Sequence, residues 1–302
     1  MKLLTFIEEQ EYRLGIKTEQ GILDVAATAE QLNLRGVPST MEEVIEQGEL
    51  GLAALRKLVL KASSVPGFPR SVWLEEEALR FAPCIPSSNK IICVGLNYRR
   101  HAEETNSPIP QTPILFSKFN NALSAHGDEI ELPAASSQVD YECELAVIIG
   151  NKTRQVTKEQ AMNYVFGYCI ANDLSARDLQ MQSSQWLLGK TCDGFSPLGP
   201  YLVTADDVEN PNDLWMKTTV NGEVRQSSRT SDMIFACEEI VSYISRHFTL
   251  MPGDVILTGT PEGVVMGRPP EDQVYLQPGD VVTVEIEKLG TLTNRMVAES
   301  IL

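Results

Sequence analysis

Two glutamates lie two positions apart beside a run of residues that is otherwise apolar. The segment Asp140-Tyr141-Glu142-Cys143-Glu144 leads directly into residues 145–149, whose apolar side chains favour a strand buried on both faces. Side chains at positions i and i+2 of a strand share a face and lie about 6.5–7 Å apart, so Glu142 and Glu144 present neighbouring carboxylates. Two buried like charges repel each other and lose hydration, so a positive partner must compensate them. A divalent cation meets that need, and pairing with arginine or lysine is the alternative.

A third carboxylate follows the next apolar strand. Residues 167–172 are mostly apolar and end at Asp173, which is positioned to complete a site of three acids with Glu142 and Glu144. No histidine or cysteine pair at metal-binding spacing lies nearby, and ligation by oxygen alone favours Mg²⁺, Mn²⁺ or Ca²⁺. Three protein ligands leave coordination positions open for water and substrate, which a catalytic metal needs. Taken alone, Asp173 is as consistent with capping the turn that follows it.

Two further elements carry polar groups suited to chemistry. His101 and Glu104 are three residues apart, so on a helix they are neighbours, and a histidine held by a glutamate is a general base. Lys190 lies in a glycine-bracketed apolar loop, where its ammonium suits an anionic substrate or a developing enolate. A solvated helix pair and a surface lysine are the simpler interpretations. The small-residue loop around Thr260 offers hydroxyl and N–H groups to an anion, which is a weak signal by itself.

Composition excludes several classes of partner. The 302 residues carry a formal net charge of −16, which argues against nucleic acid or anionic membranes as partners. No apolar run approaches the roughly 20 residues that span a bilayer, and acids follow the first apolar residues too soon for a signal peptide. The six cysteines are scattered without a Cys-x-x-Cys pair, which favours buried free thiols. We therefore expect a cytoplasmic protein.

The chain divides into two regions of different pattern. The pattern predicts a small αβ domain over residues 1–85 and a catalytic domain of many short strands over residues 86–302. The expected fold class is therefore α+β, mostly β, with the strands in a sandwich, barrel or roll. Strands are expected over residues 3–7, 13–16, 22–25, 91–95, 114–117, 144–149, 165–171, 200–204, 214–220, 223–226, 255–258 and 281–286. Helices are expected over residues 41–48, 50–62, 157–164 and 232–248, the last with Ser231 as N-cap.

An ordered set of motifs resembles the fumarylacetoacetate hydrolase superfamily, over roughly residues 91–302. The motifs are Asn97-Tyr98-x-x-His101-x-x-Glu104, Asp140-Tyr141-Glu142-x-Glu144, Asn172-Asp173-x-x-Ala176-Arg177-Asp178-x-Gln180, Gly189-Lys190-x-x-Asp193-Gly194 and Thr258-Gly259-Thr260-Pro261-x-Gly263. One departure is Arg100, where an acid often precedes the histidine.

The resemblance implies a mixed β-sandwich roll, a homodimer and one Mg²⁺ or Mn²⁺ per subunit. By matched position, Glu142, Glu144 and Asp173 are the implied metal ligands. His101, Glu104 and Lys190 are the implied catalytic residues. Arg177, Gln180 and Thr260 are the implied substrate-binding residues.

The implied reaction is hydrolysis of a C–C bond in an acylpyruvate-like 2,4-diketo acid through a metal-bound enolate. The same enolate serves oxaloacetate decarboxylation and the isomerisation or hydration of a 2-hydroxyhepta-2,4-diene-1,7-dioate, so the site alone does not choose between these reactions. A structural or interaction protein that has lost activity is the non-enzyme alternative, but none of the site residues is missing.

Overall fold

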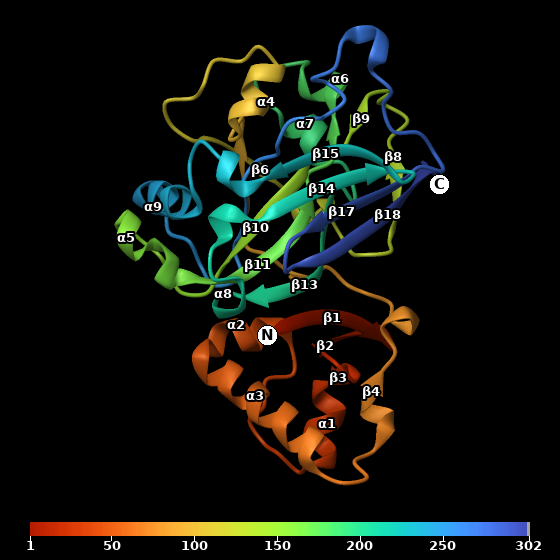
Figure 1. Cartoon of the computed structure of the whole chain (residues 1–302), viewed down its shortest axis with the longest axis vertical. Helices are drawn as coiled ribbons and strands as arrows, with labels where there is room; N and C mark the ends of the chain where they lie inside the picture. Colours follow the sequence, from red (N-terminus) through yellow and green to blue (C-terminus); the bar gives the residue numbers. More distant parts are fainter. Residues whose placement is uncertain (301–302) are drawn as a thin grey trace.

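The computed structural model describes residues 1–300 as two β-sheets packed face to face, with the N-terminal helices against the outer face of the larger sheet (Figure 1). The larger sheet has eleven strands in the order β4-β3-β2-β1-β13-β11-β10-β16-β5-β6, with β7 paired to β13. The smaller has five strands in the order β15-β14-β17-β18-β8, and β9 pairs with β12. The expected α+β fold with a sandwich of sheets is confirmed.

The elements have the following bounds. The strands are β1 (Lys2–Glu8), β2 (Glu11–Thr18), β3 (Gly21–Asp24), β4 (Trp73–Leu74), β5 (Ile91–Gly95), β6 (Ile114–Lys118), β7 (Leu123–Ser124), β8 (Glu129–Leu132), β9 (Val139–Asp140), β10 (Cys143–Ile149), β11 (Val165–Asn172), β12 (Ser175–Ala176), β13 (Ser196–Thr204), β14 (Trp215–Val220), β15 (Glu223–Arg229), β16 (Val255–Leu257), β17 (Val281–Ile286) and β18 (Gly290–Ala298). The helices are α1 (Val25–Gln31), α2 (Met41–Gln47), α3 (Glu49–Ser64), α4 (Arg99–Glu104), α5 (Lys158–Ala161), α6 (Arg177–Gln180), α7 (Leu187–Lys190), α8 (Ala205–Val208) and α9 (Cys237–His247).

Strand β10 is the centre of the packing. Leu145, Val147 and Ile149 point into the core between the two sheets. Ala146 and Ile148 point into a second core, shared with α2 and α3. Since both faces of β10 are covered, every residue of the strand can be apolar, as the sequence pattern predicts.

The N-terminal region is joined to the larger sheet. Strand β1 pairs antiparallel with β13, so β1 to β4 continue the sheet that contains β10 and β11. Figure 1 shows α1, α2 and α3 gathered around this end of the molecule. The helices predicted over residues 41–48 and 50–62 are present as α2 and α3. The division of the chain near residue 85 stays a prediction.

Two of the predicted boundaries are wrong, one because of a tertiary contact and one because of a helix cap. The helix expected over residues 232–248 begins only at Cys237, because the preceding residues hold Asn97: Phe235 donates its N–H to Asn97 Oδ1 at 2.8 Å. The strand expected over residues 22–25 ends at Asp24, whose carboxylate accepts the N–H of Ala27 at 3.1 Å and caps α1. Strands β8 and β18 and helix α1 were not predicted.

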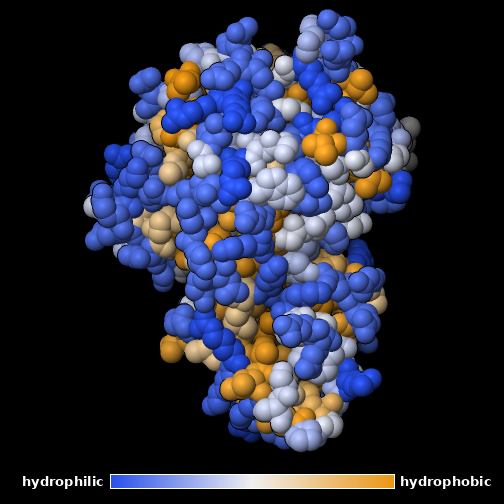
Figure 2. All heavy atoms as spheres, in the orientation of Figure 1, coloured by the Kyte–Doolittle hydropathy of each residue, from blue (hydrophilic) through white to orange (hydrophobic). Residues whose placement is uncertain are grey.

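The visible surface is largely hydrophilic. Figure 2 shows a face that is mostly hydrophilic, with apolar side chains scattered over it. Within residues 1–300, no helix is both long enough and apolar enough to cross a membrane. All six cysteines are free thiols, and only Cys192 is not fully buried.

Candidate active site

Strands β10 and β11 bring the three predicted acids together. The two strands pair antiparallel with Glu144 opposite Ala171. Asp173 follows the end of β11 and donates its N–H to the carbonyl of Glu142 at 2.9 Å. One carboxylate oxygen from each of Glu142, Glu144 and Asp173 lies within 4.8 Å of the other two, and all three side chains are buried. Glu142 itself lies just before β10 rather than inside it.

Two buried cations contact this cluster of acids. Lys190 Nζ lies 2.6 Å from Glu142 Oε2 and 2.8 Å from Asp173 Oδ2, and Arg177 Nη2 lies 2.7 Å from Glu142 Oε1. Burial disfavours the charged form of Glu142, but Lys190 and Arg177 outweigh burial and lower the pKa of Glu142 to about 2. Burial also disfavours the ammonium of Lys190, but Asp173 and Glu142 raise its pKa above the usual value. Lys190 therefore acts here as a fixed positive charge and hydrogen-bond donor.

A third buried cation, Lys118 at the end of β6, was missed by sequence reasoning. Its ammonium donates to Asp173 Oδ1 at 2.5 Å, to the Phe195 carbonyl at 2.6 Å and to the Leu174 carbonyl at 3.2 Å. All three donor positions of Lys118 are thus used, and its side chain has no exposed surface. Lys118 fixes one oxygen of Asp173 and leaves the other toward Lys190. The sequence signal was weak, since one lysine at the end of a short strand is usually exposed.

Glu144 differs from its two neighbours because it has no cation of its own. Its carboxylate accepts the N–H of Gly259 at 2.7 Å, and among residues 1–300 no lysine or arginine lies within ion-pair distance of it. Burial and the nearby Asp173 and Glu142 raise its pKa well above the usual value. A buried carboxylate beside two others, with oxygens converging within 4.8 Å, fits a hard divalent cation. The donor set therefore suits Mg²⁺, Mn²⁺ or Ca²⁺.

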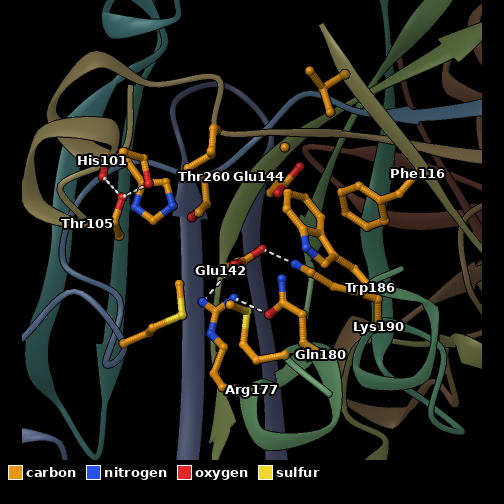
Figure 3. Close-up of a pocket in the computed structure, with 16 residues that line it drawn as sticks. His101, Thr105, Phe116, Glu142, Glu144, Arg177, Gln180, Trp186, Lys190 and Thr260 are labelled. Carbon is orange, nitrogen blue, oxygen red and sulfur yellow. Dashed lines mark hydrogen bonds and ion pairs between the residues drawn. The ribbon is translucent and has the colours of Figure 1, made fainter. Parts of the chain in front are cut away.

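The predicted histidine–glutamate pair is formed on helix α4. His101 Nδ1 lies 2.8 Å from Glu104 Oε1, and the other oxygen of Glu104 accepts the N–H of Gly263 at 2.9 Å. Glu104 therefore ties α4 to the loop that follows β16. Because Nδ1 is engaged, Nε2 is the ring nitrogen left to exchange a proton. Figure 3 shows the imidazole of His101 beside the cavity, across from Glu142 and Glu144.

The three predicted substrate-binding residues also reach this region. Arg177 Nε donates to Asp140 Oδ2 at 2.9 Å, and Nη2 lies at ion-pair distance, also 2.9 Å, from the same oxygen. Arg177 Nη1 donates to Gln180 Oε1 at 3.0 Å. The amide nitrogen of Gln180 remains free to meet a ligand. Thr260 Oγ1 accepts from Gln226 Nε2 at 2.9 Å, so its hydroxyl hydrogen is free to donate.

These groups surround a small cavity of about 140 Å³, shown in Figure 3. It is lined by Val94, Gly95, Leu96, His101, Thr105, Ser107, Phe116, Glu142, Glu144, Arg177, Gln180, Met181, Trp186, Lys190, Thr260 and Met266. Sites for drug-sized ligands occupy roughly 300–1,000 Å³, so this cavity suits a much smaller molecule. Of the nine predicted site residues, only Glu104 and Asp173 do not line it, and each contacts a residue that does.

The arrangement joins three chemical capacities in one cavity. The acids can hold a divalent cation, Lys190 supplies a positive charge beside them, and His101 can exchange a proton. Such a set suits a small anion on which negative charge develops at oxygen while a proton moves at a neighbouring atom.

Known proteins resemble this chain in sequence. Residues 90–297 match the family described as fumarylacetoacetate (FAA) hydrolase C-terminal. The chain is 46% identical, over 94% of its length and 87% of the relative's, to oxaloacetate tautomerase FAHD2A, mitochondrial, from Bos taurus.

Solved structures agree over the whole chain. Maleylpyruvate hydrolase from Sphingobium sp. SYK-6, in complex with manganese(II) ion and pyruvate, superposes with a TM-score of 0.79 at 30% identity, covering 99% of this chain and 100% of that one. The 2-hydroxyhepta-2,4-diene-1,7-dioate isomerase from Mycobacterium marinum superposes with a TM-score of 0.74 at 33% identity, covering 100% of both chains.

Proposed function

This chain belongs to the fumarylacetoacetate hydrolase family, and from that premise we propose that it is a divalent-metal-dependent enzyme that acts on a small 2-oxo acid through its enol form. The reaction that we favour is the interconversion of the enol and keto forms of oxaloacetate. The name of the bovine relative supports this choice, because the identity of 46% extends over 94% of the chain. We therefore rank proton transfer above the C–C hydrolysis that the sequence favoured.

The observation that carries the proposal is the free Nε2 of His101 facing a cavity of about 140 Å³ that also holds Lys190. In enol-to-keto conversion, the C2 hydroxyl would give its proton to His101 Nε2, and the electron pair of the C=C bond would then take that proton at C3. His101 Nε2 would carry the proton at C3, and the ammonium of Lys190 would stabilise the negative charge at the C2 oxygen. No other reactant is consumed, because the product is an isomer of the substrate.

Metal binding is assigned to the three acids. A Mg²⁺ or Mn²⁺ ion, or Ca²⁺, held by Glu142, Glu144 and Asp173 would supply Lewis-acid stabilisation of charge on the substrate's oxygens. The fit of the donor set supports this assignment, since Glu144 is buried and no lysine or arginine of residues 1–300 lies within ion-pair distance of it. The manganese ion in the Sphingobium hydrolase supports it independently.

Substrate orientation is assigned to Arg177, Gln180 and Thr260. Arg177 is held on both sides by Asp140 and Glu142, so its role is to fix Gln180 and to add positive charge beneath the substrate. The free amide hydrogens of Gln180 and the hydroxyl of Thr260 would donate to substrate oxygens. Donors fixed before the substrate arrives avoid reorganisation during the reaction.

A second candidate is hydrolysis of a C–C bond in an acylpyruvate. The contact between His101 and Glu104 favours it, because the same pair can activate a water molecule. The name of the Sphingobium neighbour, a maleylpyruvate hydrolase, favours it as well. Hydrolysis needs water in the cavity, whereas tautomerisation does not.

The test uses enol-oxaloacetate and acetylpyruvate as separate substrates, with Mg²⁺ or Mn²⁺ and with a chelator. We expect metal-dependent loss of the enol absorbance with wild-type protein and a fall of roughly 100-fold or more in His101→Asn. His247→Asn, at the exposed end of α9, is the matched control and should keep full activity. If the protein releases pyruvate from acetylpyruvate but does not convert enol-oxaloacetate, hydrolysis is the reaction and the proposed tautomerisation is wrong. Equal rates in wild type and His101→Asn would contradict both mechanisms.

We further propose that the enzyme is a homodimer in the cytoplasm with no nucleic-acid or membrane partner. The net charge of −16 supports the last part, since nucleic acids and most membrane surfaces are anionic. The bovine relative is named mitochondrial, so cell fractionation is the measurement that decides the location.

A further inference from the structure

A thin aromatic wall separates the catalytic cavity from a larger space. On one side lies the cavity of about 140 Å³, and on the other lies a groove of about 790 Å³ at the edge of the larger sheet. Phe116 and Trp186 are the two residues that line both. Figure 3 shows their rings side by side, on the far side of the cavity from His101.

The wall is held by close packing. The rings of Phe116 and Trp186 meet edge to face, with centroids 5.3 Å apart and planes at 70°. Gly95, at the end of β5, makes room for the indole, since a Cβ at that position would lie 2.4 Å from Trp186 Cζ3. Phe116 lies 5.2 Å from Lys190 Nζ, so the wall directly borders the charged part of the cavity.

The groove beyond the wall suits an apolar occupant. Its lining includes the apolar residues Ile91, Ile92, Leu115, Phe119, Leu187 and Phe248. The ammonium groups of its two lysines are already engaged, Lys118 with Asp173 and Lys90 with Asp254 at 2.7 Å. A second carboxylate would therefore find no free lysine there, whereas an alkyl chain would gain by leaving water.

We propose that Trp186 determines substrate specificity by stopping the tail of the 2-oxo acid at this wall. With the indole in place, the cavity accepts only short 2-oxo acids. Without it, the cavity and the groove become continuous, and a 2-oxo acid with an unbranched apolar tail fits. This inference rests on the proposed function only in taking the cavity as the binding site of a 2-oxo acid.

The test is binding of unreactive acids to the full-length protein, so that it does not depend on which reaction the enzyme catalyses. Oxamate mimics pyruvate, and N-alkyl oxamates from ethyl to hexyl add a tail of increasing length. Their affinities are measured by calorimetry in the presence of Mg²⁺ for wild type, Trp186→Ala and Leu187→Ala. Leu187 lines the groove but not the cavity, so Leu187→Ala is the matched control.

We expect the wild-type protein to bind N-hexyl oxamate at least roughly tenfold more weakly than oxamate, because the tail must displace packed rings. In Trp186→Ala we expect affinity to rise by up to roughly fourfold for each methylene that enters the groove. Leu187→Ala should keep the wild-type order of affinities. Phe116→Ala removes the other half of the wall and should also raise the affinity for the longer oxamates. It takes the place of Trp186→Ala if the Trp186→Ala protein does not fold.

Two results would overturn the inference, and they differ from a failure of the proposed function. If Trp186→Ala and Phe116→Ala bind oxamate but reject the longer N-alkyl oxamates as wild type does, the wall does not limit the length of tail that the cavity accepts. If wild type already binds the hexyl compound as well as oxamate, the wall is not closed. If none of the proteins binds oxamate, the cavity is not a 2-oxo acid site, and both proposals fall together.

Discussion

The two ends of strand β10 differ sharply in what they bury. Toward Ile149 the strand packs apolar side chains into two cores. Burial of one large aliphatic side chain stabilises the fold by about 1.5–3 kcal/mol. At the other end, the strand buries Glu144 and follows the buried Glu142, which pairs with Arg177 and Lys190. Buried ion pairs contribute little net stability, because desolvation offsets the Coulombic attraction.

Stability and the proposed function are thus separated within the eight residues from Glu142 to Ile149. The apolar end holds the sheets together, whereas the charged end is the part to which we assign the metal. Replacing a proposed metal ligand should therefore spare stability, and truncating an apolar residue of the strand should spare metal affinity. Lys118, which pairs with Asp173, is the exception and should affect both.

The largest effect is expected from Glu144→Gln. Even residues that only support metal ligands change affinity or activity by 10–100-fold, so loss of a ligand should lower activity by more than roughly 100-fold. Glu144 is a buried carboxylate with no ion-pair partner among residues 1–300. The free energy of unfolding of the Glu144→Gln protein, measured with a chelator present, should therefore equal or exceed that of wild type. Titration with Mn²⁺ and urea unfolding measure the two effects. Full metal affinity in Glu144→Gln would remove this residue from the site.

Lys118→Met should lower both the free energy of unfolding and the affinity for the metal. Removing one partner of a buried pair costs about 3–5 kcal/mol, and here it leaves Asp173 Oδ1 without its donor. We expect metal affinity to fall roughly 10–100-fold as well, because Lys118 orients Asp173, one of the three proposed metal ligands.

The matched control for Lys118 is Lys90→Met, which breaks the pair with Asp254 away from the acids. The control should lower the free energy of unfolding but keep wild-type metal affinity. If the two variants lose metal affinity equally, the role of Lys118 is only structural.

Ile148→Ala tests the apolar end. This side chain is fully buried in the second core, and its truncation should cost about 2–5 kcal/mol. Activity per folded molecule should stay within about twofold of wild type at a temperature where the variant is folded. A large loss of metal affinity in this variant would show that the two ends of β10 are not independent.

The smallest effect concerns pH, at a histidine outside the site. Burial lowers the pKa of His126, whose Nδ1 accepts the N–H of Thr293 at 3.1 Å and whose ring packs edge-on against Phe81. Glu76 and Asp128 oppose this shift. An unfolded histidine has a pKa near 6.5, so the unfolded chain binds more protons below that pH and stability is lost as pH falls. His126→Gln should lose less stability than wild type between pH 7.5 and 5.5 in urea unfolding, and an identical loss would contradict the assignment.

Much of the charged site could be predicted because its residues repeat a local pattern. The spacing of Glu142 and Glu144 and the strand-end position of Asp173 were enough to bring the acids together. The i, i+3 spacing of His101 and Glu104 likewise predicted their contact. In both cases the residues belong to one element or to the ends of two paired strands, so their spacing in the sequence is enough to predict that they are neighbours.

The parts that were missed depend on tertiary contacts. Lys118 reaches Asp173 only because β6 lies at the edge of a sheet whose order the sequence does not reveal. The late start of α9 follows from the bond between Phe235 and Asn97, which are distant in sequence. Pairing of the two glutamates with arginine or lysine was left open as an alternative to a metal. Within residues 1–300 the structure shows such pairs for Glu142, with Arg177 and Lys190, whereas Glu144 accepts a backbone N–H instead.

The most direct test of the central claim is a crystal structure of the protein soaked with Mn²⁺ and oxalate, a mimic of the enolate of pyruvate. We predict an anomalous peak bound by one oxygen each of Glu142, Glu144 and Asp173, with oxalate toward Lys190 and His101. A peak elsewhere, or three acids that keep only their contacts with Lys118, Lys190 and Arg177 at saturating Mn²⁺, would contradict the account.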